Sequence, residues 1–427
     1  GNLLQQFYNI ADTLIVGQFL GAQALAAVGS AFTLMTFLTS ILLGLCMGSG
    51  AVFSIRYGER NEEKLKSSIF VSFVMIALVT LVMNLLVFLL IDPIIRFMNI
   101  PSDVYGMMRD YLWVIFAGIG FVFLYNYFAA LLRAVGNSLA PLLFLAVSAV
   151  TNIVLDLLFV AVFHWGVASA ALATIISQIL SAALAFRKLM SVDTMYKVTL
   201  RKVRFDLPML KQIVTLGIPS GVQNSVISLA NVIVQANINA FGADAMAGCG
   251  TYYKLEGFAF LPVTCFALAL STFISQNIGA EKYDRVKAGM KFGLICSPVL
   301  AECIGILFYI FAPYLIGAFN SNPDVIAFGV QQARTLSLFY CLLSYSHCCA
   351  GILRGFGRPI IPMIIMLADW CLFRITYITI AVRIIPNIQV VFWAYPITWT
   401  ISTILFTLYL RKIRFPVTSE KERNFAN

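Results

Sequence analysis

The sequence predicts an all-α integral membrane protein, with twelve transmembrane helices in two six-helix lobes related by a parallel pseudo-two-fold repeat. Composition supports this fold class, because 60% of the 427 residues are hydrophobic and only 11% are charged. Soluble domains carry about a quarter charged residues. The second observation is an internal repeat, in which residues 21–29 (GAQALAAVG) return as 242–250 (GADAMAGCG), at an offset of 221 residues.

The same offset of 221 holds in two further segments: Gly58, Lys66, Leu132, Arg133, Gly136 and Pro141 correspond to Gly279, Lys287, Leu353, Arg354, Gly357 and Pro362. One offset across separated segments indicates two copies of one structural unit. Duplicated halves in so apolar a chain are typical of membrane transporters whose pathway lies between the halves.

Apolar segments of about 20 residues, the length that crosses a bilayer, define the twelve predicted spans. In the first half they are 3–20, 31–54, 68–91, 111–132, 140–163 and 166–186. In the second half they are 213–240, 252–275, 289–317, 331–352, 359–382 and 389–410. The chain starts at Gly1, already inside the first span, so we expect a few upstream residues to be missing.

Positive charge predicts the topology. Of the 29 Lys and Arg residues, 23 fall in the loops and tail on one side of the predicted membrane, which the positive-inside rule assigns to the cytoplasm. Both termini are therefore expected there, in the plasma (inner) membrane. The net charge of +10 then reflects topology, and no nucleic-acid partner is expected.

The predicted domains follow from the spans. They are an amino-terminal lobe (1–190), a cytoplasmic linker (191–211), a carboxy-terminal lobe (212–411) and a cytoplasmic tail (412–427). Six helices per lobe is an even number, so both copies share one orientation and the repeat is parallel. Nine cysteines include no C-x-x-C pair, and we expect neither a disulfide nor a cysteine metal site.

The first predicted helix carries a polar stripe: Gln5, Tyr8, Asn9 and Asp12. These spacings place all four on one helical face. A carboxylate in mid-membrane is costly and indicates function, which favours a functional role for Asp12. Gln5 and Asn9 could instead form a hydrogen-bonded seam between helices.

A second polar group lies in the helices that follow. Asn152 and Asp156 are one turn apart on the fifth helix, Thr174 lies in a small-residue stretch of the sixth, and Tyr111 lies near the predicted start of the fourth. With Asp12, these oxygen atoms suit Na⁺. The two carboxylates, close together at low dielectric, could instead share a proton. Both alternatives make the group a cation-coupling site.

The 221-residue offset maps this polar group onto residues that cannot replace it. Asp12, Asn152, Asp156 and Thr174 correspond to Ile233, Phe373, Tyr377 and Tyr395. Only the first half is therefore expected to hold the ion site. In the second half, Glu256 is interpreted as a local, interfacial residue, and Asp369 and Arg374 as a structural pair.

At these residues the chain resembles the multidrug and toxic compound extrusion (MATE) family. The resemblance is carried by the segments 8–13 (YNIADT), 16–21 (VGQFLG), 132–136, 152–156 (NIVLD), 217–219 (GIP), 275–280 (SQNIGA) and 353–357 (LRGFG). The family implies a twelve-helix transporter that exports organic, often cationic, drugs in exchange for H⁺ or Na⁺. In its DinF-like branch the cation site would fall on Asp12, Asn152, Asp156 and Thr174, with Tyr111 adjacent.

The resemblance also implies substrate contacts at Gln5 and Tyr8, to which the stripe adds Asn9. The NorM-like branch uses a carboxylate in the seventh helix where this chain has Ile227, which favours the DinF-like branch. We therefore expect a secondary-active exporter of small drug-like molecules, working as a monomer in the lipid bilayer, with no enzymatic activity and no cofactor besides the coupling ion.

The alternative function is that of a lipid-linked oligosaccharide flippase, a class of transporter with the same fold. A flippase is expected to carry more buried Arg or Lys to hold pyrophosphate, and Arg374 is the one central candidate here. A major-facilitator carrier also has two six-helix repeats, but its Gly…Asp-Arg-x-Gly-Arg-Arg loop is missing from residues 58–64.

Overall fold

The computed structural model describes residues 2–97, 102–191, 206–318 and 322–413, and all regular structure in these ranges is helical. Among the described residues, ten helices are long and apolar enough to cross a membrane, and one bent pair makes an eleventh candidate. The expectation of an all-α, multi-span membrane protein is confirmed.

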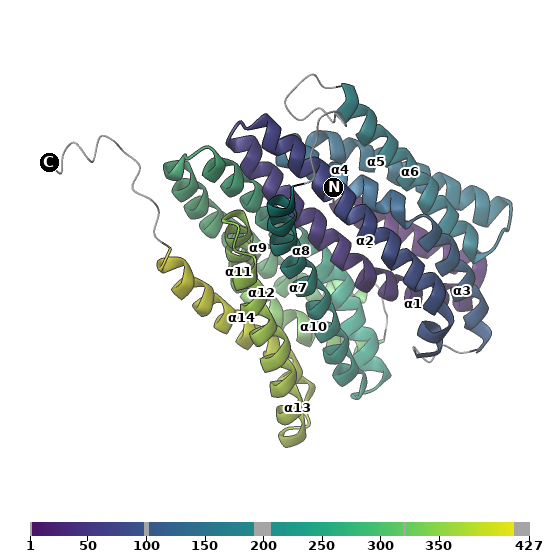
Figure 1. Ribbon diagram of the computed structural model, residues 1–427. Coiled ribbons are helices and arrows are strands. Elements are labelled where there is room, and N and C mark those ends of the chain that lie inside the picture. The colour runs from purple at the N-terminus through teal and green to yellow at the C-terminus, as the bar shows by residue number, and fades with distance from the viewer. Residues whose placement is uncertain (1, 98–101, 192–205, 319–321, 414–427) are drawn as a thin grey trace. The chain divides into compact units, whose positions relative to one another are not determined.

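The helices follow one another in the order of the predicted spans (Figure 1). The first half contains α1 (Asn2–Gly58), α2 (Glu62–Phe97), α3 (Ser102–Ala117), α4 (Ile119–Ala134), α5 (Leu139–Asp156), the π-helical η1 (Leu157–Val162) and α6 (Val167–Ser191). The second half contains α7 (Leu207–Asn239), α8 (Ala243–Gly279), α9 (Tyr283–Gly317), α10 (Pro323–Leu336), the 3₁₀ turn η2 (Ser337–Phe339), α11 (Tyr340–Gly355), α12 (Ile360–Met366), the π-helical η3 (Leu367–Phe373), α13 (Arg374–Ile384) and α14 (Ile388–Arg411).

The backbone repeats at the same 221-residue offset as the sequence. Gly21 interrupts α1 with φ of 87°, and its counterpart Gly242 precedes α8 with φ of 108°. Glycine reaches this left-handed region without steric cost. The interruption at Gly21 is why α1 accounts for two predicted spans.

Side-chain contacts recur at this offset as well. Ser54 donates a hydrogen bond to the Ala134 carbonyl (3.4 Å), and its counterpart Ser275 donates to the Gly355 carbonyl (3.1 Å). The two halves therefore reproduce the same local packing between equivalent helices.

Several helices begin earlier than the sequence predicts, and three of them begin eight or nine residues earlier. The fourth span is expected from residue 111, but α3 starts at Ser102 and bends by 47° into α4. Likewise α8 and α10 start at Ala243 and Pro323, not near 252 and 331. The added turns contain charged residues such as Asp103 and Asp324, which lower hydropathy without preventing helix formation.

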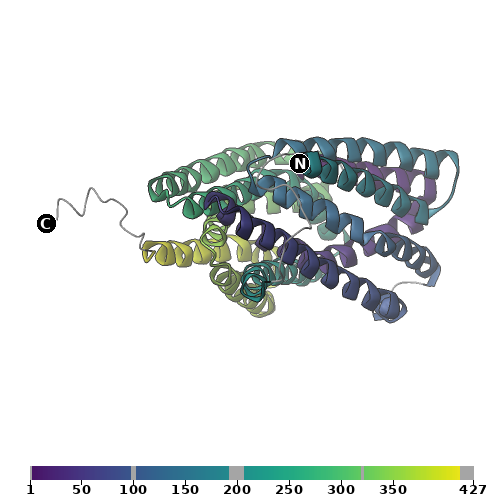
Figure 2. The same ribbon diagram turned by 45° about the horizontal axis from the view of Figure 1, so that its top comes forward.

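Contacts divide the chain into two compact units: Gly1–Tyr57 with Asn61–Gly221, and Gly58–Arg60 with Val222–Asn427. In the first unit, α6 packs against α3, α4, α5 and η1, as Figures 1 and 2 show for α5 and α6. In the second, α8 packs against α9, α10 and α11. Residues 192–205 of the predicted linker and 414–427 of the predicted tail lie outside the described residues.

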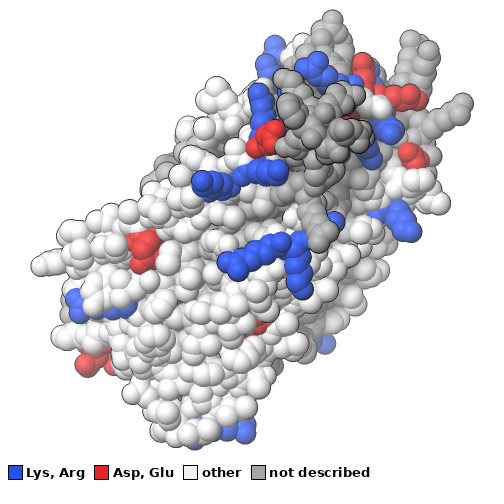
Figure 3. Space-filling view, turned by 90° about the vertical axis from the view of Figure 1, so that its left-hand side faces the viewer, with Lys and Arg blue, Asp and Glu red and all other residues white. Residues whose placement is uncertain are grey.

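The outer faces of several helices are strongly apolar. Leu81 and Leu89 on α2 are 66% and 69% exposed, and Tyr314 on α9 is 77% exposed. Figure 3 shows a broad uncharged surface with few Lys, Arg, Asp or Glu side chains. A surface of this kind is stable against lipid, so these faces are expected to contact the bilayer.

Candidate cation-binding site

Asp156 lies at the point where α5 changes from α-helix to the π-helical η1. Short π-helical segments occur frequently at functional sites, because they redirect a side chain and loosen the hydrogen-bond ladder. The Asp156 side chain is fully buried, and neither of its carboxylate oxygens accepts a hydrogen bond from any described residue. A buried carboxylate with no donor is unstable unless it binds a proton or a cation.

Asp12 on α1 faces Asp156. The two carboxyl groups lie close enough for a proton on one to be shared with the other. Oxygen Oδ1 of Asp12 is buried and accepts no hydrogen bond from the described residues. Two carboxylates this close repel each other when both are ionised, so the pair favours the presence of a cation or of at least one proton.

Asn152 and Thr174 connect α5 to α6. The Asn152 amide donates to the Thr174 hydroxyl across 3.4 Å, and the hydroxyl donates to the Ala170 carbonyl (3.1 Å). Asn152 is 2% exposed, and its Oδ1 has no donor among the described residues. Asn152 precedes Asp156 by one helical turn, so both present oxygen atoms from one face of α5.

Tyr111 is buried in the middle of α3, and not near the beginning of a helix. It is 4% exposed and belongs to the apolar cluster that includes Val16 of α1 and Ala171 of α6. These are the helices that carry Asp12 and Thr174. The structure therefore places Tyr111 in the core that holds those two helices together.

The three predicted substrate contacts lie on the first turns of α1. Gln5, Tyr8 and Asn9 are helical, but their side chains lie outside the described part of the structure. Their role stays a prediction.

The sequence argument missed three polar residues beside Asn152 and Thr174. Ser148, Ser177 and Gln178 line a narrow pocket together with them. The Ser148 hydroxyl donates to the Ser177 carbonyl (2.9 Å), and Oε1 of Gln178 is buried without a donor among the described residues. Ser148 and Gln178 lie one turn from Asn152 and Thr174 respectively, so the i, i+4 spacing was the signal that would have found them.

The equivalent region of the second unit holds a cation of its own. Arg374 is 2% exposed; it donates to the Thr398 hydroxyl from Nη2 (2.7 Å) and Nε (3.3 Å). Its guanidinium lies 4.4 Å from the ring centroid of Tyr395, the counterpart of Thr174. Among the described residues Arg374 forms no ion pair with Asp369, whose two oxygens have no donor. The direct Asp369–Arg374 pair expected from the sequence is therefore absent from the described residues.

Glu256 does not occupy a helix end. Because α8 begins at Ala243, Glu256 lies well inside that helix, where it accepts a hydrogen bond from Tyr252 (3.0 Å). Tyr252 and Tyr340 are also hydrogen bonded to each other, at 2.7 Å. The interfacial interpretation of Glu256 placed the start of its helix too late, because the first turns of α8 have low hydropathy.

Comparison with known proteins gives three findings. The sequence model of the MatE family matches residues 1–158 and again 219–380. The two matched segments are separated by almost the same interval as the internal repeat, so each copy matches the family once.

Among curated relatives, the chain is 29% identical over 380 residues to the probable multidrug resistance protein YpnP of Bacillus subtilis, covering 88% of this chain and 84% of that protein. It is 28% identical over 375 residues to the probable multidrug resistance protein NorM of Thermotoga maritima, covering 85% and 79%. A crystal structure of MATE in the bent conformation superposes with a TM-score of 0.90 at 21% identity, covering 96% of this chain and 92% of that one.

Proposed function

Since this chain belongs to the MatE family of membrane transporters, we propose that it is a secondary-active exporter of organic, often cationic, compounds, driven by inward movement of H⁺ or Na⁺. The proposed cation site comprises Asp12, Asn152, Asp156 and Thr174, with Tyr111 packed beside it. This is the arrangement that the resemblance to the DinF-like branch implies.

One observation carries the proposal: five buried oxygen atoms on α1, α5 and α6 have no hydrogen-bond donor among the described residues. They are Asp12 Oδ1, Asn152 Oδ1, both Asp156 oxygens and Gln178 Oε1. A buried acceptor without a donor costs about 1–3 kcal/mol, and more when it is charged. A proton or Na⁺ removes much of this cost, and hard oxygen ligands suit a hard cation.

Coupling requires that the site bind the cation with different affinity in two conformations. In the proposed mechanism, cation binding removes the repulsion between Asp12 and Asp156 and lets α1 pack more closely on α5. The Gln5, Tyr8 and Asn9 stripe on α1 moves with Asp12, which weakens its contacts with the drug. The transporter alternates between inward-open and outward-open states, as a monomer, in the plasma membrane with both termini in the cytoplasm.

The flippase alternative has little support from the second unit. It requires cationic side chains free to hold pyrophosphate, and Arg374 was the candidate. Arg374 is 2% exposed and is bound to Thr398 and packed on aromatic rings.

Efflux of a cationic dye from reconstituted vesicles tests the proposal. Vesicles that contain wild-type protein are loaded with dye. They are then given a pH gradient with equal Na⁺ on both sides, or a Na⁺ gradient with equal pH on both sides. We expect dye movement against its gradient under one of the two conditions and none with Asp156→Asn. Equal transport by both proteins, or no response to either gradient, would refute ion-coupled export at this site.

A further inference from the structure

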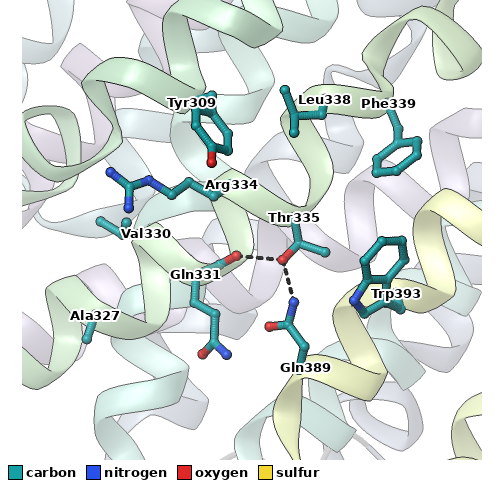
Figure 4. A pocket seen from close by; sticks show the side chains of 10 residues that line it. All are labelled: Tyr309, Ala327, Val330, Gln331, Arg334, Thr335, Leu338, Phe339, Gln389 and Trp393. Carbon is teal, nitrogen blue, oxygen red and sulfur yellow. Dashed lines mark hydrogen bonds between the residues drawn. The ribbon is translucent and has the colours of Figure 1, made fainter.

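A pocket of about 600 Å³ lies in the second unit between α9, α10, η2 and α14 (Figure 4). Its volume is within the range of small-molecule sites, about 300–1,000 Å³. Ten side chains line it: Tyr309, Ala327, Val330, Gln331, Arg334, Thr335, Leu338, Phe339, Gln389 and Trp393. None of these residues belongs to the proposed cation site.

Arg334 is the charged group of this pocket. Its guanidinium lies 5.4 Å from the centroid of the Tyr309 ring, and no carboxylate among the described residues forms an ion pair with it. Arg334 lies in the candidate span Pro323–Gly355. An unpaired cation at such a position is costly in lipid, and long basic side chains reduce that cost by reaching the headgroup region.

A second polar group faces the same pocket. The Thr335 hydroxyl donates to the Gln331 carbonyl (2.8 Å), so it accepts the hydrogen bond from the Gln389 amide nitrogen (2.8 Å). This arrangement leaves Oε1 of Gln389 buried without a donor among the described residues. Because that oxygen has no accessible surface, a ligand in the pocket cannot reach it. The pocket therefore offers one accessible cation, and a ligand that fits it must carry an anion.

The remaining wall is apolar and open to the lipid-facing surface. Leu338 and Trp393 are 44% and 42% exposed, and the Phe339 ring packs edge-on against Trp393 at 5.7 Å. Trp393 and Gln389 lie in the first turns of α14, which starts at Ile388. Tryptophan is enriched at the membrane–water boundary, which is the depth of the lipid headgroups.

We propose that this pocket binds one membrane phospholipid through the phosphate of its headgroup. Arg334 binds the phosphate, and an acyl chain lies along Leu338, Phe339 and Trp393. Basic pockets between transmembrane helices recognise lipid headgroups in this manner.

The test uses full-length protein in nanodiscs of phosphatidylethanolamine and phosphatidylglycerol, extracted in mild detergent and examined by native mass spectrometry. Wild type should retain one tightly held phospholipid. Arg334→Gln should bind it about tenfold more weakly, because a charge-assisted hydrogen bond is lost. Ala327→Trp should also lose it, by filling the pocket. The matched control is Arg383→Gln, since Arg383 is exposed in the last turn of α13.

A further measurement distinguishes a bound lipid from a free anion. Added inorganic phosphate should not displace the retained lipid, because the acyl chain also contributes to binding. Arg334→Gln is an exposed substitution, so the folded protein is expected to be recovered. Wild-type lipid retention by Arg334→Gln, equal loss in Arg383→Gln, or displacement by inorganic phosphate would each overturn the proposal.

Discussion

At the scale of single residues, the two units place different polar groups at neighbouring positions of equivalent helices. The first has acceptor oxygens without donors at Asn152 and Asp156. In the second, one position beyond the counterpart of Asn152, Arg374 supplies a permanent guanidinium that lies on Tyr395. A permanent cation cannot be gained or lost during a cycle, whereas a proton or Na⁺ can. This difference is consistent with ion exchange in the first unit alone.

Asp156→Asn and Asp12→Asn should each abolish gradient-driven dye efflux from vesicles. The amide has nearly the same size as the carboxylate, so packing is retained, and removal of a buried charge should not lower stability much. What is lost is the ability to bind and release a cation. Dye binding in the absence of a gradient should persist, because drug sites are mostly apolar.

The double variant Asp12→Asn with Asp156→Asn should be no worse than either single variant, since residues that act as one unit have non-additive effects. The checks are vesicle efflux together with the amount of folded protein recovered from the membrane. Gradient-driven efflux at the wild-type rate by Asp156→Asn is the result that would contradict the mechanism.

Asp369→Asn and Glu256→Gln should each leave substantial export, measured in the same assay. Asp369 is 3% exposed and lies near Arg374. Glu256 accepts a hydrogen bond from Tyr252. Both carboxyl groups are therefore assigned structural roles in the second unit. If either variant were expressed normally and lost export, confinement of the ion site to the first unit would be wrong.

At the scale of elements, glycines determine how closely α1 and α7 cross. Gly44 and Gly48 of α1 meet Gly221 and Gly217 of α7, and a Cβ on either α1 glycine would overlap the α7 backbone. Each helix therefore carries two glycines four residues apart, the small-residue spacing that lets transmembrane backbones approach closely. Arg56 extends this crossing by donating to Gln212 (2.8 Å).

Gly48→Leu should destabilise the protein, by about 1–3 kcal/mol for an overpacked site and more if the crossing separates. The measurement is the midpoint of thermal unfolding in detergent. Gly50→Ala on the same helix is the control, because the nearest atoms to its Cβ are 3.8 Å away. Equal unfolding temperatures for Gly48→Leu and wild type would show that the two backbones are not in close contact.

At the scale of the whole molecule, the proposed topology rests on the lysine and arginine distribution and on the even number of predicted spans per copy. A reporter inserted within 190–205 and another fused to the carboxy terminus should both read cytoplasmic. The measurement is a pair of reporters active on opposite sides of the membrane. A periplasmic signal from either position would contradict the proposed orientation.

The sequence by itself determined the features that depend on local composition and on repetition. The hydropathy of successive segments predicted the all-helical membrane fold, and the 221-residue offset predicted two copies of one structural unit. The i, i+4 spacing of Asn152 and Asp156 placed them on one face before any contact was known. Helix starts were less accurate, because charged first turns such as those of α3 lower hydropathy while remaining helical.

Only the tertiary structure decided which distant side chains meet. It brought Asp12 to Asp156, placed Gly48 against Gly217, paired Arg374 with Thr398 and assembled the Arg334 pocket from four elements. Periodicity specifies the face of a helix that is polar, but not which neighbouring helix that face contacts. That choice depends on the packing of all the helices together, since each contact is stable only where the surrounding side chains leave space for it.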